Sequence, residues 1–413
     1  GDIEILNLMG LQASAVGNHD LDLGTNFFTG LINRGTDRDG NVWRGAQFPY
    51  LSANLDFSTD TGNLAGRIAA DGAEAATQAT RVARSSVITV AGEQVGIVGA
   101  TTPTLASITS TGGITVKPAS TDIDALAAEI QPAVDALLAR GIDKIVLLAH
   151  MQQIAVEQQL ASRLKGVDLI IAGGSNTRLF DADDLIRPGD TSQGSYPQRY
   201  TSPTGEPVLL VNVDADYKYL GRILINFDGQ GRVIPGRLRT DINGAWATDT
   251  EGLKRAGLTF ANAIPEVTTI TDKIAAVIAS KDGNLFGASS VYLEGDRTFV
   301  RNEETNLGHL SALANLAYAR ANGHPETAIS LKNGGGIRSS IGSFEVEPGA
   351  VTGVKGPTRA NPAAGKLAGD ISQLDIEFAL RFNNGLSVLT VTAPELKALL
   401  EHGVASLGNQ GRF

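Results

Sequence analysis

The chain has 413 residues, of which 42% are hydrophobic and 19% charged, so it can build large cores, which excludes disordered, collagen-like and fibrous classes. The net charge of -10 argues against a nucleic-acid partner, because phosphate backbones are bound by concentrated Lys and Arg. With no cysteine, the chain offers no disulfide, no thiolate metal site and no cysteine nucleophile.

The first part of the chain alternates short apolar runs with helical patterns, as layered α/β proteins do. Residues 122–140 carry apolar residues at three- and four-residue steps, which predicts a helix packed on a sheet. We predict strands at residues 13–16, 86–90, 95–99, 144–148, 167–171, 208–211 and 223–227.

Changes in composition predict three regions in the chain. Residues 178–205 form a polar stretch that predicts a surface loop within the first domain. We predict a first domain over 1–242, a helical connector over 243–287 and a smaller α/β domain over 288–413 that ends in a strand and a helix. No run of about 18 apolar residues occurs, which predicts no membrane span. Because the chain begins at Gly1 and stops directly after a helical pattern, we expect both ends to be cut.

Polar residues follow three of the predicted strands. Asn18 and His19 come after the first strand, His150 after a later one, and Asn176 after the next. The carboxyl ends of strands are where open α/β sheets bind ligands, and imidazole and amide oxygens suit divalent metal ions. Two structural alternatives stay open, namely that residues 18–20 form a turn capping the next helix and that His150 is a structural histidine.

Several motifs then occur in one order along the chain: AVGNHDLDLG, YLSANLDF, IVLLAH, DLIIAGGSNT, NLGHL, NGGGIRSSIG and FNNGLSVLTVTAPELKALLE. Together they resemble the bacterial 5'-nucleotidase family over nearly the whole chain. The resemblance implies a layered α-β-β-α metallophosphoesterase domain followed by a smaller α/β domain that binds the nucleotide.

The resemblance also implies roles for residues of the first domain. His19 would stabilise the transferring phosphoryl group, with Asp22 as the carboxylate that orients it. Asn18, His150 and Asn176 would be metal ligands. A two-metal site with Mn, Zn, Mg or Ca is implied for the intact protein.

Two features depart from the family pattern. The family usually has His at the position of Gly174 and often at that of Asn176, and glycine has no side chain to coordinate a metal. Further ligands of the family come from strands that would precede Gly1. We therefore expect the chain to be a fragment with one metal position weakened.

In the second domain the resemblance places the substrate-binding residues Arg301, Asn333, Gly335, Arg338 and Phe382 in a nucleotide pocket. The arginines would bind phosphate or carboxylate, and Phe382 would stack on the base. A core role for Phe382 and a plain tight turn at the glycines stay open as alternatives.

We predict a hydrolase of phosphate monoesters, with nucleoside 5'-monophosphates as substrates. The alternatives are a non-catalytic nucleotide-binding or scaffold module and a phosphodiesterase of cyclic nucleotides or nucleotide sugars. The resemblance implies a periplasmic or secreted protein whose partner is a small nucleotide or phosphate ester.

Overall fold

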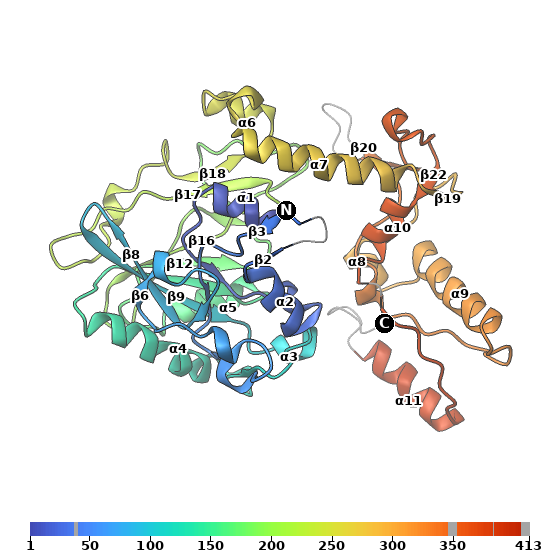
Figure 1. Cartoon of the computed structure of the whole chain (residues 1–413), viewed down its shortest axis with the longest axis horizontal. Coiled ribbons are helices and arrows are strands. Elements are labelled where there is room, and N and C mark those ends of the chain that lie inside the picture. Colours follow the sequence, from blue (N-terminus) through green and yellow to red (C-terminus); the bar gives the residue numbers. More distant parts are fainter. Residues whose placement is uncertain (37–39, 346–352, 383, 406–413) are drawn as a thin grey trace. The chain divides into compact units, whose positions relative to one another are not determined.

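The structure is a computed structural model that describes residues 1–36, 40–345, 353–382 and 384–405. It divides into two compact units, residues 1–268 and 269–413 (Figure 1). The border falls inside the span predicted as a connector. That span holds the helices α6 (Thr250–Arg255) and α7 (Pro265–Asp282) and also a strand, β18 (Gly244–Ala247). The predicted domain limits stay a prediction.

A seven-stranded sheet forms the centre of the first unit, in the order β15-β16-β12-β11-β9-β8-β6. The four strands from β16 to β9 are parallel to one another, whereas β15 and β8 pair antiparallel with β16 and β9. The parallel register sets His150 opposite Gly173. The bounds are β6 Ala73–Glu74, β8 Ser85–Val90, β9 Glu93–Thr101, β11 Ile145–His150, β12 Leu169–Gly173, β15 Gln198–Thr201 and β16 Pro207–Val211.

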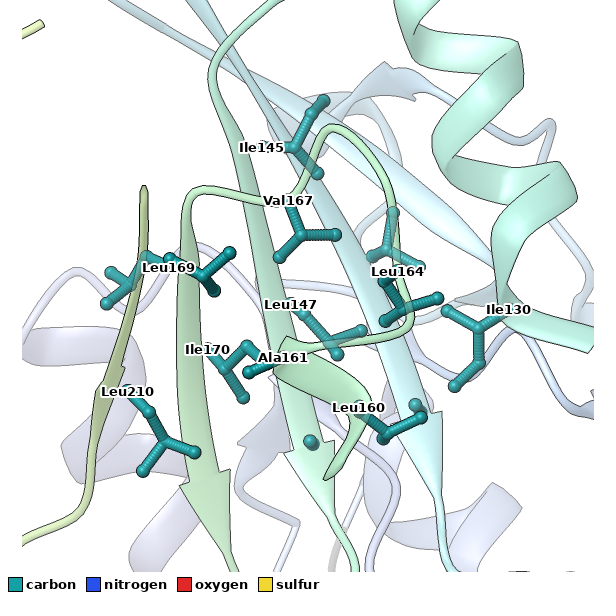
Figure 2. Close-up of a cluster of buried hydrophobic side chains, with 14 of the residues drawn as sticks. Ile130, Ile145, Leu147, Leu160, Ala161, Leu164, Val167, Leu169, Ile170 and Leu210 are labelled. Atoms are coloured by element: carbon teal, nitrogen blue, oxygen red, sulfur yellow. The ribbon is translucent and has the colours of Figure 1, made fainter. Parts of the chain in front are cut away.

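Two helices, α4 (Ile123–Leu138) and α5 (Ile154–Ala161), cover one face of this sheet (Figure 2). The Asp122 side chain caps α4 by accepting a hydrogen bond from the Ala125 N–H at 2.9 Å. The apolar face of α4 is buried against the sheet, as its spacing predicts. The cluster includes Ile130, Ile145, Leu147, Leu160, Ala161, Leu164, Val167, Leu169, Ile170 and Leu210.

A second sheet packs on the other face, with three parallel strands in the order β1-β4-β7. These are β1 (Ser14–Ala15), β4 (Tyr50–Leu51) and β7 (Val82–Ala83). A Cβ at Gly99 of β9 would lie 2.2 Å from the Leu51 backbone, so the glycine permits the close approach of the two sheets. Helix α2 (Gly24–Ile32) closes the outer side with its own apolar cluster. The layered α-β-β-α fold is therefore confirmed.

Shorter elements complete the first unit. The pair β17 and β18 is antiparallel. The remaining elements are α1 Asp2–Leu8, β2 Gly35–Thr36, β3 Val42–Trp43, β5 Leu55–Asp56, α3 Leu105–Ile108, β10 Thr115–Val116, β13 Leu179–Phe180, β14 Gly194–Ser195 and β17 Tyr219–Arg222.

Two predictions for this unit are wrong. Residues 223–227 form no strand, because the Asn243 side chain replaces a strand partner for Leu224. It accepts a hydrogen bond from the Leu224 N–H at 2.6 Å and donates one to the Leu224 carbonyl at 3.3 Å. The stretch 178–205 is not only a surface loop. It supplies β13, β14 and β15, and β15 is an edge strand of the main sheet.

The second unit has two short antiparallel pairs and several helices. Strand β19 (Leu285–Ala288) pairs with β22 (Asp370–Ser372), and β20 (Ser343–Glu345) pairs with β21 (Val354–Gly356). The helices are α8 Arg297–Val300, α9 Asn306–Ala321, α10 Gln373–Ala379 and α11 Ala393–Val404. The predicted closing helix is confirmed as α11. The strand predicted before it is wrong, because no described segment pairs with residues 385–391.

A buried ionic network joins the end of α7 to the start of α10. The Lys366 ammonium donates to Asp282 at 2.8 Å and to Asp375 at 2.6 Å, and Ser372 also donates to Asp282 at 2.7 Å. Lys366 is 5% exposed, so the network is shielded from solvent and its charges are compensated. Within the described ranges, no helix has both the length and the apolar character needed to cross a bilayer.

The buried carboxyl of Asp168 predicts a pH-dependent stability. It accepts a hydrogen bond from the Ile145 N–H at 2.8 Å, and burial raises its pKa from 3.8 to about 7. Between those values the folded chain binds one more proton than the unfolded chain, so this group lowers the free energy of unfolding as pH rises from 4 to 7. We expect Asp168→Asn, which keeps the acceptor, to stabilise the protein by about 2 kcal/mol more at pH 8 than at pH 5. Thermal melts across this range test it, and a gain that does not grow with pH would contradict it.

Candidate functional site at the strand ends

The first group of predicted site residues follows β1. Asn18 precedes a short 3₁₀ helix, His19–Leu21, and is buried, with 6% of its surface exposed. The His19 side chain is accessible, and its Nδ1 lies 2.6 Å from Asp22 Oδ2. Thr109 donates to the other Asp22 oxygen at 3.1 Å. The hydrogen bond from Thr109 therefore holds the Asp22 carboxylate in place, and the carboxylate in turn orients the His19 ring through Nδ1.

His150 ends β11 and meets Asn18. Its Nε2 lies 3.0 Å from Asn18 Oδ1, although 132 residues separate the two in sequence. A Cβ at Gly17 would lie 2.9 Å from the His150 ring, so a side chain at position 17 would displace the imidazole. The structure thus brings together residues from β1 and β11 that the sequence could place only at the ends of separate strands.

The electrostatics of this edge favour a neutral imidazole. Burial, followed by the nearby charge of His19, lowers the pKa of His150 to about 4. A neutral ring nitrogen is the form that binds a metal ion. Asp20, which accepts a hydrogen bond from the Gly17 N–H at 2.7 Å, has its pKa raised by burial to about 6.

The end of β12 brings Gly174 and Asn176 to the same edge. A Cβ at Gly174 would lie 2.8 Å from His150 Nε2, so this position faces the candidate site, and its φ of +80° suits glycine. Asn176 is exposed and also has a left-handed backbone, with φ of +53°. Within the part of the chain that the structure describes, Asn176 makes no hydrogen bond with Asn18 or His150.

One residue of this cluster was missed by the sequence analysis. The Gln152 amide nitrogen donates to Asn18 Oδ1 at 2.6 Å and lies 3.1 Å from His150 Nε2. The only signal in the sequence is that Gln152 follows a predicted strand end by a few residues, which many surface glutamines also do.

The donors at this edge fit part of a metal shell. Ligands bound at about 2.1 Å to one cation and at right angles lie about 3 Å apart, which is the separation of His150 Nε2 and Asn18 Oδ1. Among the residues described, no three His, Asp or Glu side chains gather closely enough to hold a metal. The available set is therefore one imidazole with amide oxygens.

The predicted substrate residues lie in the second unit, and three of them gather at one turn. Asn333 caps the short helix Gly334–Gly336 and accepts a hydrogen bond from the Gly335 N–H at 2.8 Å. A Cβ at Gly335 would lie 3.5 Å from a terminal nitrogen of Arg301, so the glycine and the guanidinium are neighbours. Burial, with the charges of Arg297 and Arg338, lowers the pKa of Arg301. A cluster of arginines thus concentrates positive charge in an acidic protein.

Arg338 and Phe382 complete the predicted set. The Arg338 guanidinium lies over the Phe382 ring, 5.3 Å from its centroid. The Arg338 backbone N–H also donates to the carbonyl of Ala379 at the end of α10, which ties the glycine turn to that helix. Beside them is an open cleft of about 1040 Å³ that is lined by Asn333, Gly336 and Asn384, among others.

The first unit has a layered α-β-β-α architecture, with imidazole and amide donors at the ends of its strands. Residues 285–413 match the family model for the 5'-nucleotidase C-terminal domain. The solved structure of the 5'-nucleotidase precursor from Thermus thermophilus is 27% identical, covers 100% of this chain and 66% of its own, and superposes with a TM-score of 0.70.

Curated proteins agree with these matches. The 5'-nucleotidase of Mus musculus is 28% identical over 99% of this chain and 60% of its own length. The snake venom 5'-nucleotidase of Gloydius brevicauda is 26% identical over 97% of this chain and 58% of its own. The C-terminal third of the chain therefore matches the 5'-nucleotidase C-terminal domain, and the chain as a whole is similar to 5'-nucleotidases. It spans about three fifths of the length of these curated relatives.

Proposed function

We propose that the protein hydrolyses phosphate monoesters with the help of divalent cations, and that nucleoside 5'-monophosphates are its substrates. The observation that carries this proposal is the approach of Asn18 to His150 at the sheet edge, with the His19–Asp22 pair on the same segment as Asn18. The match of residues 285–413 to the 5'-nucleotidase C-terminal domain and the similarity to a solved 5'-nucleotidase precursor support it.

In the reaction, water adds to phosphorus while the bond to the 5' oxygen breaks, and that oxygen takes up a proton and leaves with the nucleoside. Asn18, His150 and Asn176 would hold a divalent cation, which supplies positive charge for the phosphoryl oxygens when bound. His19 would donate a hydrogen bond to the phosphoryl group as negative charge spreads over its oxygens. Asp22 would act as a positioning residue, because it holds the ring through Nδ1.

The second unit would bind the nucleotide. Arg301 and Arg338 would attract its anionic groups, and Asn333 would supply amide hydrogen bonds next to the cleft. Phe382 would stack on the base, with the Arg338 guanidinium over its ring as a cation–π partner. We propose that the predicted domains divide these tasks: residues 1–242 would catalyse the hydrolysis, and residues 288–413 would bind the nucleotide.

We also propose that the protein acts in the periplasm or outside the cell. The support is its similarity to a 5'-nucleotidase named as a venom protein. The chain's lack of cysteine is compatible with an oxidising compartment.

The substrate class is tested by measuring phosphate release from AMP, from p-nitrophenyl phosphate, and from cyclic AMP and a UDP-sugar followed by product analysis. We expect kcat/KM to be highest for AMP, because only AMP combines a base for Phe382 with a terminal phosphate. Binding of AMP without hydrolysis would favour the nucleotide-binding module instead. Cleavage of cyclic AMP or the UDP-sugar in preference to AMP would favour a phosphodiesterase.

A further inference from the structure

Gln152 has a side chain directed into the candidate metal site. It lies two residues beyond the end of β11, and its amide nitrogen is 2.6 Å from Asn18 Oδ1 and 3.1 Å from His150 Nε2. Asn18 and His150 are themselves 3.0 Å apart, so the three polar groups form a closed triangle. Three side chains from two separate segments therefore converge on one point at the sheet edge.

The backbone of Gln152 is held in an unfavourable conformation. Its φ is +68°, in the left-handed region that residues with a Cβ rarely adopt. The turn is fixed on both sides, because the Met151 N–H bonds to the Gly173 carbonyl at 3.2 Å and α5 begins at Ile154. Glycine would adopt this φ at lower cost, so a glutamine is expected here only if its side chain makes an interaction that glycine cannot make.

The surroundings of Gly174 indicate what that contribution is. A Cβ at Gly174 would lie 2.8 Å from His150 Nε2 and 3.1 Å from the Gln152 backbone nitrogen. Position 174 therefore offers no donor of its own, and a side chain there would displace His150. Position 174 thus adds no ligand beside Asn18 and His150, whereas the Gln152 side chain already reaches both.

We propose that Gln152 is a metal ligand, whose amide oxygen joins Asn18 Oδ1 and His150 Nε2 around a divalent cation. Half a turn about the terminal torsion exchanges the amide nitrogen and oxygen, and this torsion is a soft one. The nitrogen then no longer bonds to Asn18, and the oxygen faces the cation. This assignment rests on the proposed metal-dependent function and deepens it.

The test is calorimetric titration with Mn²⁺ of the parent protein, Gln152→Gly and a matched control, Ala91→Gly. Ala91 also has a left-handed backbone, with φ of +51°, but lies in the exposed turn between β8 and β9. Both glycine variants relieve the same kind of strain, so neither is expected to melt below the parent. We expect Mn²⁺ binding to weaken about tenfold or more in Gln152→Gly alone.

A second variant, Gln152→Glu, separates a ligand from a residue that merely fills the site. Its carboxylate has only acceptor atoms, so the metal-free variant should melt lower, and Mn²⁺ should raise its melting temperature by more than it raises the parent's. Unchanged or tighter Mn²⁺ binding in Gln152→Gly would overturn the assignment while leaving the proposed function in place. A parent protein that binds no Mn²⁺ would overturn both.

Discussion

His19→Ala should lower kcat for AMP about 10²-fold or more and leave KM nearly unchanged. The ring is accessible and is oriented by its 2.6 Å bond to Asp22, which places it to meet charge that develops only in the transition state. Groups that act only in the transition state appear in kcat, whereas groups that bind substrate and transition state equally appear in KM. Steady-state kinetics with AMP measure both.

His324→Ala is the matched control for this variant, because His324 is an exposed histidine of the second unit that pairs only loosely, at 3.6 Å, with Glu326. It should leave both kinetic parameters unchanged. If His19→Ala raises KM and spares kcat, then His19 binds the ground state, and its proposed role in the phosphoryl transfer fails.

Arg338→Ala should show the opposite pattern, with KM raised about tenfold and kcat nearly preserved. Arg338 belongs to the arginine cluster with Arg297 and Arg301 and lies 5.3 Å over the Phe382 ring. Its loss removes charge that attracts the nucleotide and also support for the stacking surface. These interactions are the same in the ground state and the transition state, so they affect affinity.

The control is Arg320→Ala, which removes one positive charge from an exposed position where the guanidinium donates to the Thr327 carbonyl. Similar changes in KM for both arginine variants would mean that net charge, and not the position of Arg338, determines affinity. A loss of kcat in Arg338→Ala equal to that in His19→Ala would contradict the division of labour between the two units.

The elements with strong local signals were predictable. The apolar spacing of residues 122–140 predicts α4, and the buried run before His150 predicts β11. Where contacts with distant residues determine the secondary structure, the sequence pattern gave the wrong prediction. Residues 223–227 have the pattern of a strand, but the Asn243 side chain forms the hydrogen bonds of the Leu224 backbone. The polar residues 198–201 form a strand because they pair with the edge of β16.

The sequence predicted only which site residues follow the ends of strands. The sequence places Asn18 and His150 after two strands, but only the packing of the β1 sheet against the β11 sheet brings their side chains to 3.0 Å. Gln152 escaped prediction for a different reason. Its proposed role depends on a left-handed backbone that propensity does not assign to glutamine.

Phosphate release is expected to require a divalent cation at the strand ends. The most direct measurement is phosphate release from AMP by the full-length protein after removal of metal with a chelator, and again after Mn²⁺ or Mg²⁺ is restored. We expect activity to be lost on chelation and recovered with metal in the parent, and His150→Ala to recover little at the same metal concentration. Full activity in the metal-free parent would contradict it.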